Sequence, residues 1–176
     1  NRMKLNINSL KERPNKVSIE HDHIPLTAEP KQFGNNQNAI LEKTVGKIKT
    51  ARNNKKPVML AFGAHAIKNG LSKIFIDLMK RDWVTHLATN GAGIIHDWEY
   101  AFQGESSEDV ETYVKEGQFG IWEETGFYNN LAINLGARER LGYGESVGAL
   151  IQNEGLTIPA ESELIAEVEQ YIAEEP

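Results

Sequence analysis

The sequence has no cysteine and no long apolar run. Without cysteine there is no disulfide framework, no thiol nucleophile and no thiolate metal site. No stretch approaches the ~20 apolar residues that a membrane-spanning helix requires, so we expect no membrane segment and no membrane partner. The first ten residues also lack the apolar stretch of a signal peptide. Because a reducing compartment is compatible with the missing cysteine, these absences favour a soluble, cytoplasmic protein.

The composition that remains is typical of a globular protein, since 40% of the 176 residues are apolar and 25% are charged. Charge is distributed unevenly: residues 1–56 carry 12 Lys and Arg against 5 Asp and Glu, whereas residues 57–176 carry 7 against 20. We expect the basic leader to pack on the acidic body, either of its own chain or of a neighbouring subunit. Because the basic residues form no stripe and do not alternate with aromatic residues, no nucleic-acid partner is expected.

Prolines and a glycine break the first part of the chain, which predicts an irregular arm over residues 1–36 with one short strand at 16–20. An α/β body is predicted over residues 37–176. It opens with an amphipathic helix at 38–52, which we interpret as a connector or packing helix.

Two apolar runs follow, and each ends in a glycine-rich turn. VMLAF at 58–62 is typical of a strand buried on both faces, and WVTHLAT at 83–89 predicts a second strand. An apolar stripe over residues 67–79 predicts one helix between them. Strand, helix and strand together predict a βαβ unit, that is, an α/β fold with a parallel sheet and flanking helices. Such sheets bind ligands beyond the carboxyl ends of their strands, where both turns lie.

The rest of the chain is predicted to be helical, with a short helix opened by SSED at 106–109, helices at 128–141 and 147–152, and an acidic amphipathic helix after residue 161. A doubly wound sheet usually has about five or six strands, and only two are predicted here. We therefore expect the sheet to be completed either by another copy in a homo-oligomer or by the missing C-terminal part of a longer protein.

The first glycine-rich turn begins at Gly63 and continues through Ala64 and His65 into a helix that contains Asn69. Glycine lets a ligand approach the backbone, and an exposed helix N-terminus favours phosphate. The turn lacks the G-x-G-x-x-G dinucleotide fingerprint, and a plain tight turn explains Gly63 equally well.

The second turn is richer in polar groups. Backbone amides and small polar side chains come from Thr89, Asn90, Gly91 and Ala92. His96 and Asp97 follow in the next helix, where they can transfer a proton, bind a polar substrate or orient a ligand. The alternative is that His96 is a partly buried packing residue and that Asp97 stabilises the helix N-terminus.

A divalent metal held by His65 and His96 with Asp97 or Glu99 is a further possibility, because imidazole and carboxylate suit zinc, iron or manganese. No H-x-x-x-H spacing supports it, so no metal site is predicted, and a metal-dependent hydrolase stays an alternative function. The His21-Asp22-His23 segment is expected to be solvated.

Glu123 and Glu124 lie beside Trp122 and can line a pocket for a cationic amine through charge and cation–π contact. Such a pair of carboxylates is more often a solvated surface, so both interpretations stay open.

The stretch FGAHAIKNGLSKIFIDLMKRDWVTHLATNGAGIIHD, residues 62–97, resembles the deoxyhypusine synthase family, and particularly its bacterial deoxyhypusine synthase-like branch. In that family a strand, a small-residue turn, a helix with a Gly-Leu/Ile step, a second strand and a T-T-G-A-x-x-x-H-D type turn occur in this order. The resemblance implies an NAD-binding parallel α/β fold, an oligomer with shared sites, and NAD-assisted transfer or oxidation of an amine. Eukaryotic members transfer an aminobutyl group from spermidine to a protein lysine.

Carried over by position, the resemblance assigns NAD contacts to both turns. The implied NAD-binding residues are Gly63, Ala64, His65, Asn69, Thr89, Asn90, Gly91 and Ala92. His96 takes the place of an active-site acid of the eukaryotic enzymes and agrees with the bacterial histidine, and Asp97 matches the acid after it. Both are therefore the implied catalytic residues, with His96 handling protons.

Nothing in the sequence matches the family's later segment, which carries the catalytic lysine. This polypeptide alone is therefore not expected to catalyse aminobutyl transfer. The alternative is a non-catalytic nucleotide-binding or assembly domain with the same fold.

Overall fold

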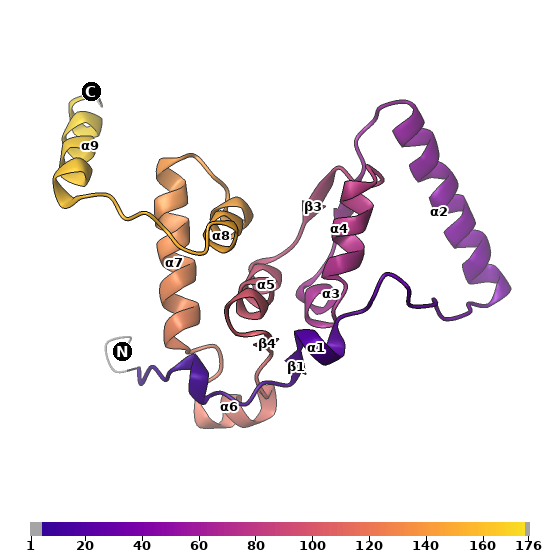
Figure 1. Cartoon of the computed structure of the whole chain (residues 1–176), viewed down its shortest axis with the longest axis horizontal. Coiled ribbons are helices and arrows are strands. Elements are labelled where there is room, and N and C mark those ends of the chain that lie inside the picture. The colour runs from indigo at the N-terminus through magenta and orange to yellow at the C-terminus, as the bar shows by residue number, and fades with distance from the viewer. Residues whose placement is uncertain (1–4, 175–176) are drawn as a thin grey trace. The chain divides into compact units, whose positions relative to one another are not determined.

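The computed structural model describes residues 5–174 of a mixed α/β chain (Figure 1). The chain divides into two compact units, Asn1–Phe127 and Tyr128–Pro176, and every described strand lies in the first. None of the helices within the described range combines the length and apolarity that a membrane crossing requires.

The N-terminal arm is attached to the body of the first unit. It contains the 3₁₀ helix η2 (Leu10–Glu12), strand β1 (Val17–Ser18) and helix α1 (Ile19–Asp22). The strand predicted at 16–20 is thus present but shorter, because Ser18 caps α1 by accepting a hydrogen bond from the His21 amide. β1 pairs antiparallel with β4 (Glu105–Ser106), with Val17 opposite Ser106, so the arm is held by backbone hydrogen bonds.

Helix α2 (Asn35–Asn53) confirms the helix predicted at 38–52 and extends it at its N-terminus. The Gln37 side chain accepts a hydrogen bond from the Gly34 amide and so satisfies one of the free N–H groups at the helix start. The apolar face of α2 stays open, since Ile40 and Leu41 are 66% and 49% exposed. Within the described residues, α2 therefore does not act as the predicted packing helix.

The predicted parallel pair of strands is confirmed. β2 (Met59–Ala61) and β3 (His86–Ala88) are parallel, with Leu60 opposite Leu87. The expectation that the first strand is buried on both faces is wrong, because Met59 is 66% exposed. Only the face of Leu60 packs on the core. Successive strand residues point to opposite faces, so one covered face leaves alternate side chains open.

The single helix predicted over 67–79 is instead two helices, α3 (Ala64–Lys68) and α4 (Ser72–Lys80). Gly70 separates them with a φ of +81°, a left-handed conformation that favours glycine. A Cβ at Gly70 would also collide with the carbonyl oxygen of Asp22, so the arm passes directly over this turn. Ile67 and Phe75, one on each side of the break, still pack in the same core.

Helix α5 (Gly91–Gln103) follows β3, as predicted, and packs beside α3. Its N-cap is Asn90, and its C-cap is Gly104 in the left-handed conformation. Helix α6 (Val110–Glu116) begins after the predicted SSED segment, where the Asp109 carboxylate accepts a hydrogen bond from the Thr112 amide.

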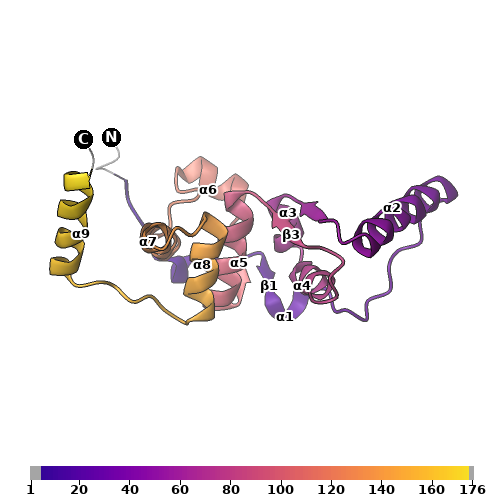
Figure 2. The same cartoon turned by 90° about the horizontal axis from the view of Figure 1, so that it is seen from above.

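The remaining helices are α7 (Glu123–Arg138), α8 (Tyr143–Gln152) and α9 (Glu161–Glu174), and α7 and α8 begin earlier than predicted (Figure 2). Gly136 of α7 lies directly against Ser146 of α8, since a Cβ at Gly136 would collide with the Ser146 hydroxyl. Arg138 at the end of α7 binds Glu163 and Glu167 of α9.

Candidate functional site

A cavity of about 400 Å³ in the first unit is lined by α3, α5 and the segment that follows β4. Its wall contains the ionisable side chains of Arg13, His65, Lys68, His96, Glu99 and Glu108, together with the ring of Trp122. A volume of this size suits a small ligand or part of a larger one. Charged groups, imidazoles and an aromatic ring therefore meet in one place.

The structure brings some of the predicted site residues into the lining of this cavity, whereas others lie outside the lining. Ala64, His65, Ala92 and His96 line it. The remaining predicted positions do not line it: Gly63, Asn69, Thr89, Asn90, Gly91 and Asp97. Because β2 and β3 are parallel neighbours, their carboxyl ends place the two glycine-rich turns side by side.

The second turn combines a satisfied cap with an unsatisfied hydroxyl. The Asn90 side chain accepts a hydrogen bond of 3.1 Å from the Gly93 amide. The neighbouring Thr89 hydroxyl oxygen is buried and has no partner among the described residues. A buried hydroxyl at the start of the 13-residue helix α5 suits a polar or anionic group such as a phosphate.

The first turn leaves space for a ligand to approach the backbone. Gly63 has ordinary extended backbone angles, and a Cβ placed there would meet no atom within 4 Å. Glycine at this position is therefore required neither by the backbone conformation nor by packing within the described part of the chain. A plain tight turn therefore does not explain why position 63 is a glycine.

A buried ion pair contributes to the lining of the cavity. The Arg13 guanidinium donates to both carboxylate oxygens of Glu99, at 2.9 and 2.8 Å, and these side chains are 2% and 3% exposed. Glu99 also accepts hydrogen bonds from the hydroxyls of Ser106, at 2.6 Å, and Thr125, at 3.1 Å. Four donated hydrogen bonds compensate for the removal of this carboxylate from water.

His96 is attached to this network through one ring nitrogen. Its Nδ1 lies 2.7 Å from the Ser106 hydroxyl oxygen. Burial lowers the pKa of His96 and Lys68 lowers it further, while Glu99 acts in the opposite direction. The net pKa lies below the ordinary value of 6.5, so the imidazole is neutral at neutral pH and able to accept a proton.

Trp122 lies at another wall, beside Arg13 and Glu108. Its indole N–H donates to Glu108 at 2.9 Å, and the guanidinium carbon of Arg13 is 5.4 Å from its ring centre. The predicted carboxylate neighbour Glu124 instead accepts from the Ser9 hydroxyl at 2.7 Å and the Leu10 amide at 2.5 Å. Burial raises the pKa of Glu124, but these hydrogen bonds outweigh it and the net pKa is lowered. Glu124 therefore holds the arm in place, and Glu99 and Glu108 are the carboxylates of the cavity.

The expectation that the His21-Asp22-His23 segment is solvated is wrong for His23. Both of its ring nitrogens are buried, and its ring contacts Tyr100 edge to face at 5.0 Å. Burial lowers the pKa of His23, as does Lys73. Desolvation by the surrounding protein atoms raises the pKa of Asp97, while the nearby His23 acts in the opposite direction. The residue as a whole still keeps contact with solvent. Asp97 thus belongs with the arm rather than with the cavity.

No group of three metal-ligating side chains occurs within residues 5–174. The alternative metal set predicted from the sequence, His65 and His96 with Asp97 or Glu99, is therefore not assembled around a common point. His65 and His96 share the cavity, but Asp97 does not line it.

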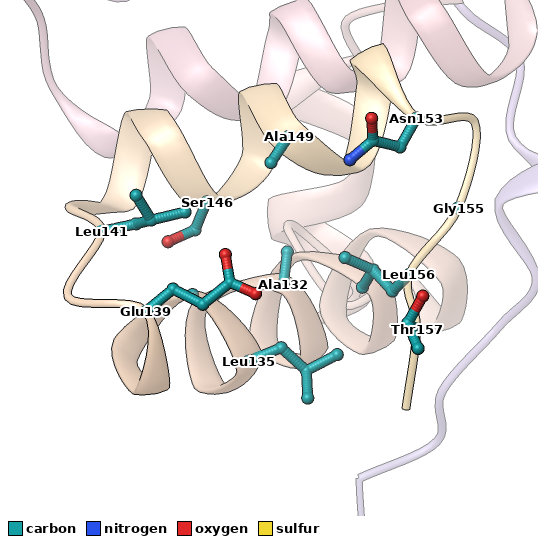
Figure 3. Close-up of a pocket in the computed structure, with 11 residues that line it drawn as sticks. Ala132, Leu135, Glu139, Leu141, Ser146, Ala149, Asn153, Gly155, Leu156 and Thr157 are labelled. Atoms are coloured by element: carbon teal, nitrogen blue, oxygen red, sulfur yellow. The ribbon is translucent and has the colours of Figure 1, made fainter. Parts of the chain in front are cut away.

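A second cavity, of about 410 Å³, lies in the second unit between α7, α8 and the segment after α8 (Figure 3). Glu139 is the one charged residue of its lining, and the polar side chains of Ser146, Asn153 and Thr157 accompany it. The Ser146 hydroxyl is already used, since it donates to the carbonyl of Gly142. With no imidazole and no aromatic ring, this cavity offers less chemistry than the first.

Sequence reasoning missed Arg13, Ser106 and Glu108, and it considered Glu99 only as a metal ligand. The sequence did carry a signal for the proximity of Glu99 to His96, because residues three apart share a helix face. Arg13 and Ser106 had none, because only the pairing of β1 with β4 brings these segments together.

Comparison of the chain with protein-family models, with curated proteins and with solved structures finds no match.

Proposed function

We propose that this chain is the nucleotide-binding part of a deoxyhypusine synthase-like protein, which binds NAD at the two glycine-rich turns and transfers or oxidises an amine in the adjoining cavity. The observation that carries the proposal is the position of the cavity beside the carboxyl ends of two parallel strands. This is where parallel α/β sheets bind their ligands.

The residues present fit an extended, phosphate-containing cofactor. The open space at Gly63, the buried Thr89 hydroxyl and the N-terminus of α5 suit a pyrophosphate. Lys68 in the cavity wall adds a positive charge. When bound, NAD supplies a hydride acceptor.

The cavity side chains fit an amine. Glu108 carries a negative charge in the cavity wall, and the donors bound to its carboxylate, the Gly120 amide and the Trp122 indole, are neutral. Oxidation of an amine to an imine removes a hydride from carbon and a proton from nitrogen. His96 is neutral at neutral pH and lines the cavity, so it is the residue proposed to take that proton.

Calorimetric titration with NAD tests the cofactor proposal. Gly63→Val occupies space at the first turn, where an added Cβ meets no described atom within 4 Å, and saturable NAD binding should be lost. Gly46→Val is the matched control, because an added Cβ at Gly46 on exposed α2 also meets no described atom within 4 Å, and this variant should bind NAD like the unaltered chain.

Absence of NAD binding by the folded, unaltered chain would refute the cofactor assignment. Equal loss in both variants would show that a general effect, rather than the turn, is responsible. If NAD binds but incubation with spermidine produces no NADH, the result favours the alternative of a non-catalytic nucleotide-binding domain or a chain that requires the family's later segment.

A further inference from the structure

Three side chains form a hydrogen-bonded series from the buried ion pair to the cavity: Glu99, Ser106 and His96. The Ser106 oxygen lies 2.6 Å from Oε2 of Glu99 and 2.7 Å from Nδ1 of His96. Ser106 and Glu99 are both buried. Water therefore does not compete for either contact, and the hydrogens must come from the three side chains.

The first contact uses the one hydroxyl hydrogen of Ser106. Both oxygens of Glu99 accept from the Arg13 guanidinium, so Glu99 is an ionised carboxylate and can only accept. Two oxygens 2.6 Å apart need a hydrogen between them. That hydrogen belongs to Ser106, which therefore donates to Glu99.

The second contact then has one possible donor. Ser106 has no further hydrogen, and a nitrogen and an oxygen 2.7 Å apart also need one. The hydrogen must be carried by Nδ1 of His96. We infer that Ser106 and Glu99 are positioning residues that hold neutral His96 in its Nδ1–H tautomer and leave Nε2 as the proton acceptor.

This tautomer determines whether a ligand must donate or accept a hydrogen bond at His96. Nε2 makes no hydrogen bond to any residue within the described part of the chain. It carries a lone pair, so it binds an N–H or O–H group and not a carbonyl or phosphate oxygen. An amine or a hydroxyl is thus the ligand class at His96. The role of Nε2 in amine oxidation rests on the proposed function, whereas the tautomer does not.

Nuclear magnetic resonance of the full chain, labelled with ¹⁵N in histidine, tests the tautomer directly. Protonated and unprotonated ring nitrogens differ strongly in shift, and long-range couplings to ring protons identify Nδ1 and Nε2. The chain has five histidines, so His96→Gln assigns the signal by its disappearance. Above the pKa of His96, the unaltered chain should show a protonated Nδ1 and an unprotonated Nε2. A protonated Nε2 there would overturn the inference without any further variant.

Two serine variants test the cause. Ser106→Ala removes the acceptor of the Nδ1 hydrogen, so the His96 signals should move toward the average of two exchanging tautomers. Ser72→Ala is the matched control, because the Ser72 hydroxyl is also buried but has no hydrogen-bond partner within residues 5–174, and the substitution should leave His96 unchanged. An unchanged His96 spectrum in folded Ser106→Ala would show that Ser106 does not set the tautomer.

The proposed function can fail separately. If the chain does not bind NAD, the histidine spectrum should still show a protonated Nδ1 on His96. If His96 instead carries its proton on Nε2, the result of the NAD titration is unaffected.

Discussion

Arg13 and Arg138 each bind carboxylates through their guanidinium groups, but in contrasting surroundings. Arg13 and Glu99 are 2% and 3% exposed, whereas Arg138 is 30% exposed and its partners Glu163 and Glu167 are 57% and 47% exposed. Removing one member of a buried pair leaves an uncompensated charge, whereas water solvates the remaining member of an exposed pair. Similar contacts should therefore differ greatly in their contribution to stability.

The carboxylates around Arg138 illustrate the point. Their hydrogen bonds raise its pKa, but a guanidinium is already fully charged at neutral pH. The shift consequently adds no pH dependence in the physiological range. In the second unit, the close packing of Gly136 on Ser146 is therefore expected to contribute more to stability than the ion pairs of Arg138.

The largest expected effect is that of Arg13→Met. It leaves the Glu99 carboxylate buried without its guanidinium, which should reduce the free energy of unfolding by about 3–5 kcal/mol. All three tryptophans, Trp83, Trp98 and Trp122, lie in the first unit, so urea denaturation followed by tryptophan fluorescence measures this unit.

The double variant Arg13→Met/Glu99→Met is the control for Arg13→Met, since it removes the stranded charge and should recover much of the loss. A single variant no less stable than Arg138→Met would contradict the contrast between the two arginines.

An intermediate effect is expected at the helix contact of the second unit. Gly136→Ala forces a methyl group against Ser146 and should cost about 1–3 kcal/mol. Gly148 lies at an exposed position of α8, where an added Cβ meets no described atom within 4 Å, so Gly148→Ala should stabilise the helix by about 0.5–1 kcal/mol. Urea denaturation followed by circular dichroism compares the two. The same sign for both substitutions would show that the α7–α8 contact is not close.

The smallest effect is expected for Arg138→Met. The carboxylates of Glu163 and Glu167 are exposed and return to water, so the thermal midpoint measured by circular dichroism should hardly change. Addition of salt should reduce any difference further, because salt screens exposed charges. A loss as large as that of Arg13→Met would mean that α9 depends on this arginine.

The helices and the parallel strand pair were the predictable part of the fold. Apolar periodicity located α2, α5 and α9, and each depends mainly on local spacing. The break at Gly70 was missed because the apolar stripe continues across it, so that Ile67 and Phe75 still share one core. Gly70 separates the helices by its left-handed conformation, and its missing side chain leaves room for the Asp22 carbonyl of the arm, a long-range contact.

The candidate site was predictable in part. The sequence located both glycine-rich turns, because turn chemistry and strand ends are local features, and four of the predicted site residues line the cavity: Ala64, His65, Ala92 and His96. Asp97 was predicted beside His96, but it does not line the cavity, whereas His96 does. Glu99, three residues after His96 and on the same helix face, lines the cavity as well.

The sequence by itself determined the positions of most helices, the two parallel strands and the uneven charge. The basic leader was expected on an acidic body, and Arg13 does bind Glu99 of the same chain. Only the tertiary structure decided which basic residue is buried, which carboxylate receives it and which serine joins that pair to His96. The reason is physical: periodicity and turn chemistry act between near neighbours, whereas a buried charge is stable only where distant segments supply all of its hydrogen bonds at once.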